Sequence, residues 1–274
     1  MQPERNGSGK QPTMSSISIW ENPPECLDLP FNEVHVWRAS LDLPSTDIQS
    51  LLAILSDDER ARAERFRCSR DGQRSIASRG LLRLLVACYR AADPSEIGFR
   101  YSREGKPALA DEAAARGLRF NVSHSHGLAL FAFARGRELG VDLERMDPVV
   151  SGERIPENFF SPRECAALRA LPVEQQPGAF FACWTRKEAY IKAKGKGLSI
   201  RLDQFDVSLA PSEPAALLET AEGSREARRW SLHDLSPAPG YAGALVVEGQ
   251  GSKLHGWQLN RETLLLTRSS VSVN

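Results

Sequence analysis

Alternating apolar and polar residues mark the strands of this chain, and a spacing of three to four residues marks its helices. Residues 33–41, EVHVWRASL, alternate and predict a strand. Residues 46–66 then take helical spacing behind Thr46, a residue type that often caps a helix start. A long helix with a buried apolar face is expected from Arg74 onward. The chain therefore opens as a strand followed by helices.

Three arginines share the polar face of the helix that runs on from Arg74. They are Arg79, Arg83 and Arg90. Cations opposite an apolar stripe more often form a solvated surface than a binding site, so these side chains are expected to face water.

Short strands separated by turns follow. Residues 97–102 read as a strand before the tight turn REGKP. Residues 118–123, 128–134 and 139–144 alternate and are separated by the turns HSHG and RGRE, which predicts an antiparallel meander.

The second half of the chain echoes the first. The elements expected there are helices over residues 162–171 and 180–194, and strands within residues 205–210, 228–235 and 241–249. The long helix of this half should end at Gly195. No residue-level repeat is visible, but a shared order of elements suggests an internal duplication with a cleft between the halves, where small molecules commonly bind.

Composition and element order predict four divisions of the chain. Residues 1–30 form a flexible extension rich in Gly, Ser, Pro, Gln and Asn at its start, and residues 31–137 form the N-terminal half. Residues 138–260 form the C-terminal half, and residues 261–274 are a tail.

Charge and cysteine content limit the classes of function. The chain has 35 basic and 35 acidic residues, so no global field draws it to nucleic acid or to an anionic membrane. It has neither a signal sequence nor a segment approaching the roughly 20 apolar residues of a membrane span, and we expect a cytosolic protein. Five scattered cysteines without a CxxC pair argue against disulfides and zinc ribbons.

Two carboxylates are forced together in the segment GVDLE. The strand period of two places Asp142 and Glu144 on one face. Like charges at that spacing are unfavourable unless a cation or a strong donor lies between them. A solvated strand edge is the other interpretation of this short motif.

A helix contributes a third carboxylate among many cations. Glu188 and Lys192 are four residues apart and lie on one helix face, an arrangement that is often only a surface salt bridge. Here, however, five cations surround this single acid between residues 184 and 200, which suggests an external polyanion.

Together, Asp142, Glu144 and Glu188 could hold Mg²⁺, which takes its remaining ligands from water and substrate phosphates. Neighbouring lysines would hold the phosphate charge that the metal leaves uncovered, a layout suited to phosphoryl transfer. Ser123 and His124 fit as phosphate donors. The pair His124 and His126 lacks the third His or Cys of a zinc site.

Five segments in order resemble the signature series of the Sfp-type 4'-phosphopantetheinyl transferases: FRYSREGKPAL, FNVSHS, LGVDLE, FFSPRE and FFACWTRKEAYIKAKGKGLS. The resemblance covers roughly residues 30 to 250. It implies transfer of the 4'-phosphopantetheine arm of coenzyme A to a serine of an apo acyl or peptidyl carrier protein, with Mg²⁺ as cofactor and adenosine 3',5'-bisphosphate as the second product. It also implies an α+β fold, a pseudo-twofold arrangement of two similar α/β halves with the active site in the cleft between them.

The resemblance assigns roles residue by residue. Asp142, Glu144 and Glu188 match the metal-binding carboxylates, and Asp142, Glu188 and Lys192 make up the implied catalytic set. Glu188, or a metal-bound water that it orients, is the candidate base. The implied coenzyme A ligands are Arg62, Arg70, Arg74, Lys106, Ser123, His124, Lys187 and Lys192.

Three further cations near the last motif have no fixed role. Arg186 is extra to the family pattern and is expected to contact the carrier or solvent. Lys194 and Lys196 are expected to solvate the turn after the helix or to touch an acidic carrier.

Two other functions stay open at this stage. One is a Mg²⁺-dependent pyrophosphatase acting on coenzyme A or another nucleotide, and the other is a coenzyme A or carrier-binding module without turnover. Nucleic-acid binding is disfavoured, because the cations cluster locally and aromatic residues are not interleaved with them. We expect a monomer, since one chain supplies both halves of the cleft.

Overall fold

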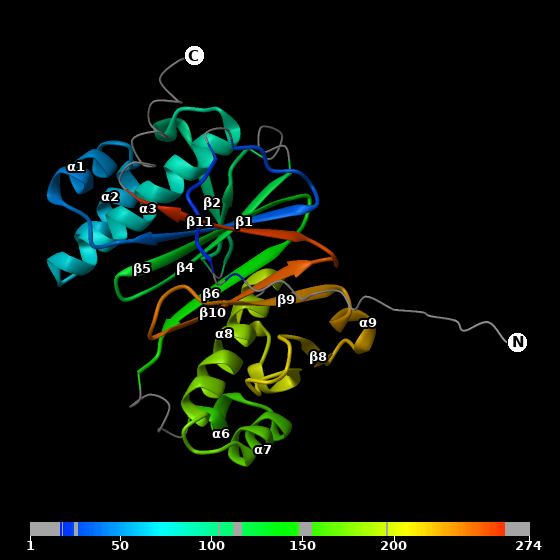
Figure 1. The fold of residues 1–274 in the computed structure, drawn as a ribbon. Coiled ribbons are helices and arrows are strands. Elements are labelled where there is room, and N and C mark those ends of the chain that lie inside the picture. The colour runs from blue at the N-terminus through cyan, green and yellow to red at the C-terminus, as the bar shows by residue number, and fades with distance from the viewer. Residues whose placement is uncertain are drawn as a thin grey trace, which may run out of the picture.

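Two sheets pack face to face and helices cover their outer faces (Figure 1). The computed structural model describes residues 17, 19–24, 27–103, 105–111, 117–147, 155–195 and 197–260. The predicted tail, much of the predicted N-terminal extension, and Lys196 lie outside these ranges. The predicted α+β class is confirmed. No helix within the described ranges is long and apolar enough to cross a membrane.

The first half contributes one long helix and most of one sheet. Its elements are β1 (Glu33–Ser40), α1 (Ser45–Ala53), α2 (Asp57–Glu64), α3 (Ser69–Arg90), η1 (Pro94–Glu96), β2 (Phe99–Tyr101), β3 (Pro107–Leu109), β4 (Leu118–Ser125) and β5 (Leu128–Arg135).

The second half repeats this plan around a second long helix. Its elements are β6 (Leu139–Arg145), α6 (Ile155–Phe159), α7 (Pro162–Ala170), α8 (Gln176–Lys194), η2 (Gly197–Ser199), η3 (Leu202–Gln204), β7 (Phe205–Val207), β8 (Leu217–Thr220), α9 (Ser224–Ala227), β9 (Trp230–Leu235), β10 (Tyr241–Glu248) and β11 (Lys253–Leu259).

Sheet topology supports an internal duplication. The first sheet has the order β11-β1-β5-β4 and the second the order β6-β10-β9. In the first half β1 pairs antiparallel with β5, and β5 with β4. In the second half β6 likewise pairs antiparallel with β10, and β10 with β9. Each half also carries a short hairpin, β2–β3 or β7–β8. The sequence pattern did not predict β11, which leaves the second half to pair parallel with β1.

Strand alternation divides the apolar residues among three cores. On β1, Trp37 packs toward α3 while Val34 and Val36 pack between the two sheets. Phe180 of α8 belongs to a third core on the outer face of the second sheet. Each sheet is therefore apolar on both faces, as expected for a layer between a helix and another sheet.

Two predictions about the opening helices are wrong. The helix expected over residues 46–66 is two helices, because the backbone leaves helical geometry at Ser56, where Glu59 reaches back to the Ser56 amide and starts α2. Thr46 is no cap, since α1 already begins behind Pro44.

Arg83 does not face water as predicted. It is 2% exposed, and its Nε donates to Glu59 Oε2 at 2.7 Å. Glu59 is 4% exposed and also accepts from the Ser56 amide at 3.1 Å. The carboxylate that starts α2 thus anchors α3 through a buried ion pair.

The second half contains the same device. Glu164 accepts from the amide of Ser161 at 2.9 Å at the start of α7, and from Lys187 Nζ of α8 at 2.7 Å. Both members of this ion pair are at most 2% exposed. The segments SDDE and SPRE are therefore a residue-level trace of the duplication that the sequence analysis overlooked.

The predicted meander is only partly correct. β4 and β5 form an antiparallel pair, but β6 takes β10 as its partner in the other sheet. β6 instead lies against β4 through side chains, at the seam where the two halves meet.

Candidate functional site

Polar side chains on one face of β4 form the seam with β6. The strand period places Asn121, Ser123 and Ser125 on that face. Asn121 Oδ1 accepts from the amide of Val141 at 2.8 Å, and Ser125 Oγ accepts from the amide of Arg145 at 3.1 Å. Side chains thus satisfy the β6 backbone where a neighbouring strand would otherwise do so.

Close contact between β6 and α8 brings two sets of site residues together. A Cβ on Gly140 would overlap the Ala189 carbonyl oxygen and the Ala193 amide nitrogen. Only glycine permits this approach of strand to helix. It places Asp142 of β6 directly against Lys192 of α8.

Asp142 is the centre of the site. Its Oδ1 accepts from Lys192 Nζ at 2.6 Å and from Ser123 Oγ at 3.0 Å, and Lys192 Nζ also donates to Ser123 Oγ at 2.9 Å. Glu144, two residues along β6, accepts from Ser125 Oγ at 3.0 Å. The structure therefore brings residues of β4, β6 and α8 into one polar cluster.

The site carries more negative charge than its own cation balances. Asp142 is 3% exposed, and its Oδ2 makes no hydrogen bond among the described residues. Burial and then the charge of Asp142 raise the pKa of Glu188, and the same two causes raise the pKa of Glu144. One ammonium, that of Lys192, faces three carboxylates, so a further cation would be held favourably here.

The three carboxylates are neighbours and do not yet form a closed ligand set. Within the described ranges, the group of three potential metal ligands whose donor atoms lie within 4.8 Å of one another is a different one, formed by Glu33, His35 and His255. Side-chain rotations would be needed to bring the carboxylates Asp142, Glu144 and Glu188 onto one ion.

Two cavities flank Lys106 beside this cluster. One of about 400 Å³ is bordered by Tyr101, Arg119 and Lys106, and one of about 200 Å³ by Lys106, Asn121 and Lys192. Lys106 Nζ donates to the Lys192 carbonyl at 2.7 Å, and burial lowers the pKa of this lysine. Lys106 therefore lines the cleft while it ties the first half to α8.

Ser123 and His124 point to opposite sides of β4. His124 borders a third cavity, of about 370 Å³, together with Arg74 of α3. Partial burial, then the charges of Lys192 and Arg79, lower the pKa of His124, whose ring keeps an exposed edge. The two predicted phosphate donors are thus separated: Ser123 lies in the polar cluster with Asp142 and Lys192, and His124 borders a cavity.

The other predicted arginines lie around these cavities. Arg70 and Arg74 both donate to Asp42, and Arg74 is the more buried, at 17% exposed. Arg62 stacks over Tyr101 with 4.3 Å between the guanidinium carbon and the ring centre. Of the three, Arg74 alone lines a described cavity.

The prediction that Lys187 binds coenzyme A is not supported. Its ammonium is fully buried and donates to Glu164 and to the carbonyl oxygens of Leu202 and Phe205, at 2.5–2.7 Å. These contacts use all three N–H donors of a lysine. Lys187 thus belongs to the scaffold, although it precedes Glu188 in the sequence.

Arg186 does not face carrier or solvent. It is 3% exposed, and its guanidinium forms two parallel hydrogen bonds to Asp234, of 2.7 and 2.9 Å. A third donor bonds to the Ser208 carbonyl. Arg186 holds α8 against β9.

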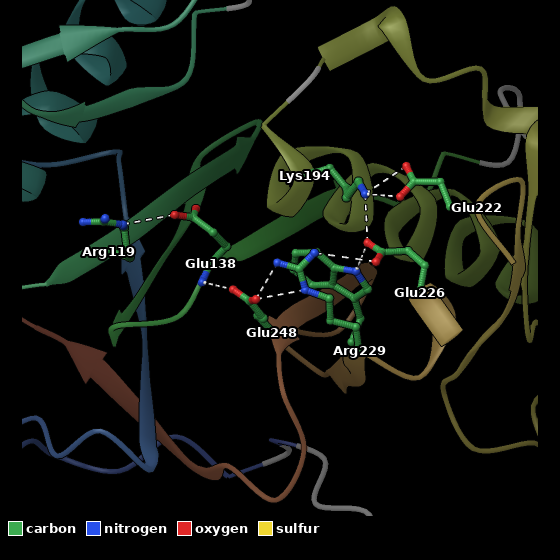
Figure 2. A network of polar contacts seen from close by, with 8 residues as sticks. Arg119, Glu138, Lys194, Glu222, Glu226, Arg229 and Glu248 are labelled. Atoms are coloured by element: carbon green, nitrogen blue, oxygen red, sulfur yellow. Dashed lines mark hydrogen bonds and ion pairs between the residues drawn. The ribbon is translucent and has the colours of Figure 1, made fainter. Parts of the chain in front are cut away.

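Lys194 is also an internal residue, as Figure 2 shows. Its ammonium donates to Glu222 at 3.0 Å and to Glu226 at 2.8 Å, and its side chain is 8% exposed. The same view shows Arg229 paired with Glu248 beside it. These contacts correct the expectation that Lys194 solvates the turn.

Sequence reasoning missed Asn121 and Ser125. Both belong to the segment FNVSHS, but only Ser123 and His124 were assigned roles there. Part of the signal was available, because the polar residues at 121, 123 and 125 follow the strand period and so share one face. The pattern alone does not distinguish a solvated face from one that packs on β6.

Comparison with protein families matches both halves. The family model described as "4'-phosphopantetheinyl transferase, N-terminal" matches residues 35–135. The model described as "4'-phosphopantetheinyl transferase superfamily" matches residues 138–246.

Whole-length relatives agree with these matches. The chain is 42% identical to the 4'-phosphopantetheinyl transferase HetI of Nostoc sp., over 87% of this chain and 95% of the relative. It is 34% identical to the 4'-phosphopantetheinyl transferase psf-1 of Bacillus pumilus, over 82% and 92%. It is 32% identical to Sfp of Bacillus subtilis, over 61% and 72%. The chain belongs to the 4'-phosphopantetheinyl transferase superfamily.

Proposed function

We propose that this chain transfers the 4'-phosphopantetheine arm of coenzyme A to a serine hydroxyl of an apo acyl or peptidyl carrier protein, a holo-carrier synthase activity. The observation that carries the proposal is the cluster at the seam, where Asp142, Glu144 and Glu188 lie beside Lys192. Family membership supplies coenzyme A as substrate and carrier domains as acceptors. Both halves of the cleft come from one chain, so the proposed active unit is a monomer.

The donor set fits Mg²⁺. The three side chains offer carboxylate oxygens, and the Asp142 Oδ2 atom is buried without a hydrogen bond among the described residues. Burial, and then the charge of Asp142, raise the pKa values of Glu144 and Glu188, and a bound cation would relieve both effects. Asp142, Glu144 and Glu188 would hold the ion. When bound, Mg²⁺ would neutralise charge on the pyrophosphate and act as a Lewis acid there.

The chain's own cations account for the rest of the substrate charge. Lys192, at the junction of β6 and α8, would bind the pyrophosphate and stabilise the negative charge of the leaving group. Arg74 and His124, which share a separate cavity, would bind the remaining phosphate of coenzyme A. Lys106, between the two other cavities, would contact the nucleotide.

The proposed transfer needs no nucleophile from this chain, because the chain positions the carrier serine against the pyrophosphate of coenzyme A. The carrier serine hydroxyl attacks the β-phosphorus in line, its proton leaves, and adenosine 3',5'-bisphosphate departs. Glu188 is the proposed base, acting directly or through a water that it orients. A bound metal ion would lower the pKa of this carboxylate, which favours the route through water.

The test measures the mass of an apo-carrier after incubation with coenzyme A, Mg²⁺ and enzyme. Asp142→Asn and Glu188→Gln should each lower the rate of carrier labelling roughly 1,000-fold or more, since a catalytic metal contributes several kcal/mol. Glu222→Gln is the matched control, because Glu222 is an exposed carboxylate in the same half that pairs only with Lys194 among the described residues.

Three results would count against the proposal. Full activity in Glu188→Gln would show that the reaction does not depend on the carboxylate cluster as proposed. Cleavage of coenzyme A without any carrier would indicate a pyrophosphatase. Binding of coenzyme A with no reaction, in the presence of a panel of acyl and peptidyl carriers, would indicate a binding module.

A further inference from the structure

Three metal-ligating side chains meet where β11 joins β1, away from the carboxylate cluster. Strand periodicity places Glu33 and His35 on the same face of β1. The parallel register sets His35 directly beside His255 of β11. Within the described ranges these are the residues whose donor atoms all lie within 4.8 Å of one another.

The spacing of these atoms matches a tetrahedral metal centre. Zinc–ligand bonds of about 2.0–2.1 Å place neighbouring ligand atoms about 3.3 Å apart. Glu33 Oε2 lies 3.2 Å from His255 Nε2 and 3.6 Å from His35 Nε2. One carboxylate oxygen therefore already stands at ligand distance from two imidazole nitrogens.

The Nε2 atom of His255 lies within ion-pair distance of Glu33 but is not satisfied by a hydrogen bond among the described residues. This nitrogen atom is buried. A buried ring nitrogen without a hydrogen bond is costly, and it is satisfied when it ligates a metal. The His255 ring stacks on Trp257, with 5.2 Å between centres and 12° between planes, which fixes its orientation.

The ring of His35 is oriented by the hydroxyl of Tyr89. Its Nδ1 lies 2.8 Å from the Tyr89 hydroxyl of α3, which leaves Nε2 to face Glu33. An outer partner of this kind orients a ligating histidine.

Solvent has access to the open side of this group. The side chains of Glu33 and His255 are 18% and 22% exposed, whereas that of His35 is 3% exposed. Lys253, 3.4 Å from the other oxygen of Glu33, is 64% exposed and free to swing away. Three protein ligands with a fourth position open to water are a familiar arrangement for zinc.

We propose that Glu33, His35 and His255 bind a divalent transition metal of the zinc class, and that this ion fixes β11 onto β1. Two imidazoles and one carboxylate select against Mg²⁺, which prefers oxygen ligands. The site is thus chemically distinct from the carboxylate cluster. Its ion would tie the strand that leaves the second half to the opening strand of the first.

The test is a competition titration of tag-free, chelator-treated protein with Zn²⁺ against a chromogenic chelator. It uses Glu188→Gln as the background and contains excess Mg²⁺, to suppress zinc binding at the carboxylate cluster. We expect one equivalent of tight binding, weakened at least about 100-fold by His255→Ala, because loss of a ligand should cost no less than loss of an outer partner. His126→Ala removes an exposed histidine outside the group and should change nothing.

Two further measurements keep the proposal testable if His255→Ala does not fold. Glu33→Gln preserves the shape of the side chain and should abolish the rise in melting temperature that Zn²⁺ gives the parent protein. Zn²⁺ should also slow amide exchange in β11. Equal zinc affinity in the parent and His255→Ala, an equal thermal shift in Glu33→Gln, or unchanged exchange in β11 would each overturn the proposal.

Discussion

The two halves share one scaffold, but only the second carries the carboxylate cluster. In each, a carboxylate at the start of a short helix receives a buried cation from the long helix: Glu59 from Arg83, and Glu164 from Lys187. The residue that follows the cation differs. It is Leu84 in the first half, within the apolar core, and Glu188 in the second, beside Asp142.

One step along a helix turns the side chain by about 100°, so adjacent residues can serve unrelated purposes. The duplicated fold needs its buried cation in both copies, and so Lys187 is retained as part of the scaffold. The next helical face differs between the two copies. In one copy it is apolar, and in the other it supplies Glu188 and, one turn later, Lys192.

The largest expected effect tests the shared ion pair. Lys187→Met should lower the free energy of unfolding by about 3–5 kcal/mol, because it leaves the buried carboxylate of Glu164 without its charge partner. Arg83→Met should cost less, because Arg79 still lies 3.5 Å from Glu59. Urea denaturation followed by circular dichroism measures both. Arg201→Met, which breaks an exposed pair with Asp203, is the control and should leave the midpoint unchanged.

Replacing Lys187 should affect stability and leave substrate binding unchanged. Lys187→Met that remains folded at low temperature should keep its KM for coenzyme A, since Lys187 has no free donor for a phosphate. A large rise in KM with little loss of stability would indicate that Lys187 binds the substrate. Lys187 would then not be the structural counterpart of Arg83.

The next effect concerns only the face of α8 that carries Lys192, which we propose acts in catalysis. Lys192 stands five residues after the buried cation of α8, and Cys88 stands five residues after that of α3. Lys192→Met should lower kcat about 100-fold, as expected when one preorganised charge on a developing anion is lost. Cys88→Ala should leave kcat unchanged. Similar losses in both variants would mean that the rate reports packing of the long helices rather than charge at the site.

A smaller effect is expected at the seam between the halves. Asn121→Leu removes the acceptor for the Val141 amide and should lower the free energy of unfolding by about 1–3 kcal/mol. Val122→Ala, on the opposite face of β4, is a packing control for the same strand. If Asn121→Leu unfolds at the same urea concentration as the parent, a water or another group must satisfy that amide.

Local patterns predicted the elements of this fold better than their pairing. Alternation located β4, β5 and β6, and helical spacing with Gly195 located the end of α8. The partner of β6 was not predictable in this way, because it depends on the distant strand β10 and on side chains such as Asn121. Loss of helical geometry at Ser56 was visible as a capping signal but was read as part of one helix.

The sequence predicted the site residues whose positions follow from strand period or helical spacing. It did not reveal which of the predicted residues are buried in the scaffold. Asp142 and Glu144 share a strand face by periodicity, and the structure adds Lys192 to them. A sequence does not reveal that Lys187, Arg186 and Lys194 point into the protein, since their partners lie 15 to 48 residues away. Cations that look like one patch in the sequence are therefore divided between scaffold and site.

The smallest effect separates the proposed phosphate-binding groups of the two halves. Lys192 comes from the second half, and His124, beside Arg74, from the first. Partial burial and neighbouring cations hold the pKa of free His124 below its usual 6.5. A bound phosphate favours the protonated ring, so coenzyme A binding should take up a proton and tighten a few-fold as pH falls below 6.5.

His124→Gln should lose this part of the pH dependence and keep the part that arises from the ligand's own phosphates. Calorimetry without Mg²⁺, in buffers of different ionisation enthalpy, measures both. Identical proton uptake by the two proteins would leave Arg74 as the phosphate ligand of the first half, and the second half would then supply the titrating group as well as the metal ligands.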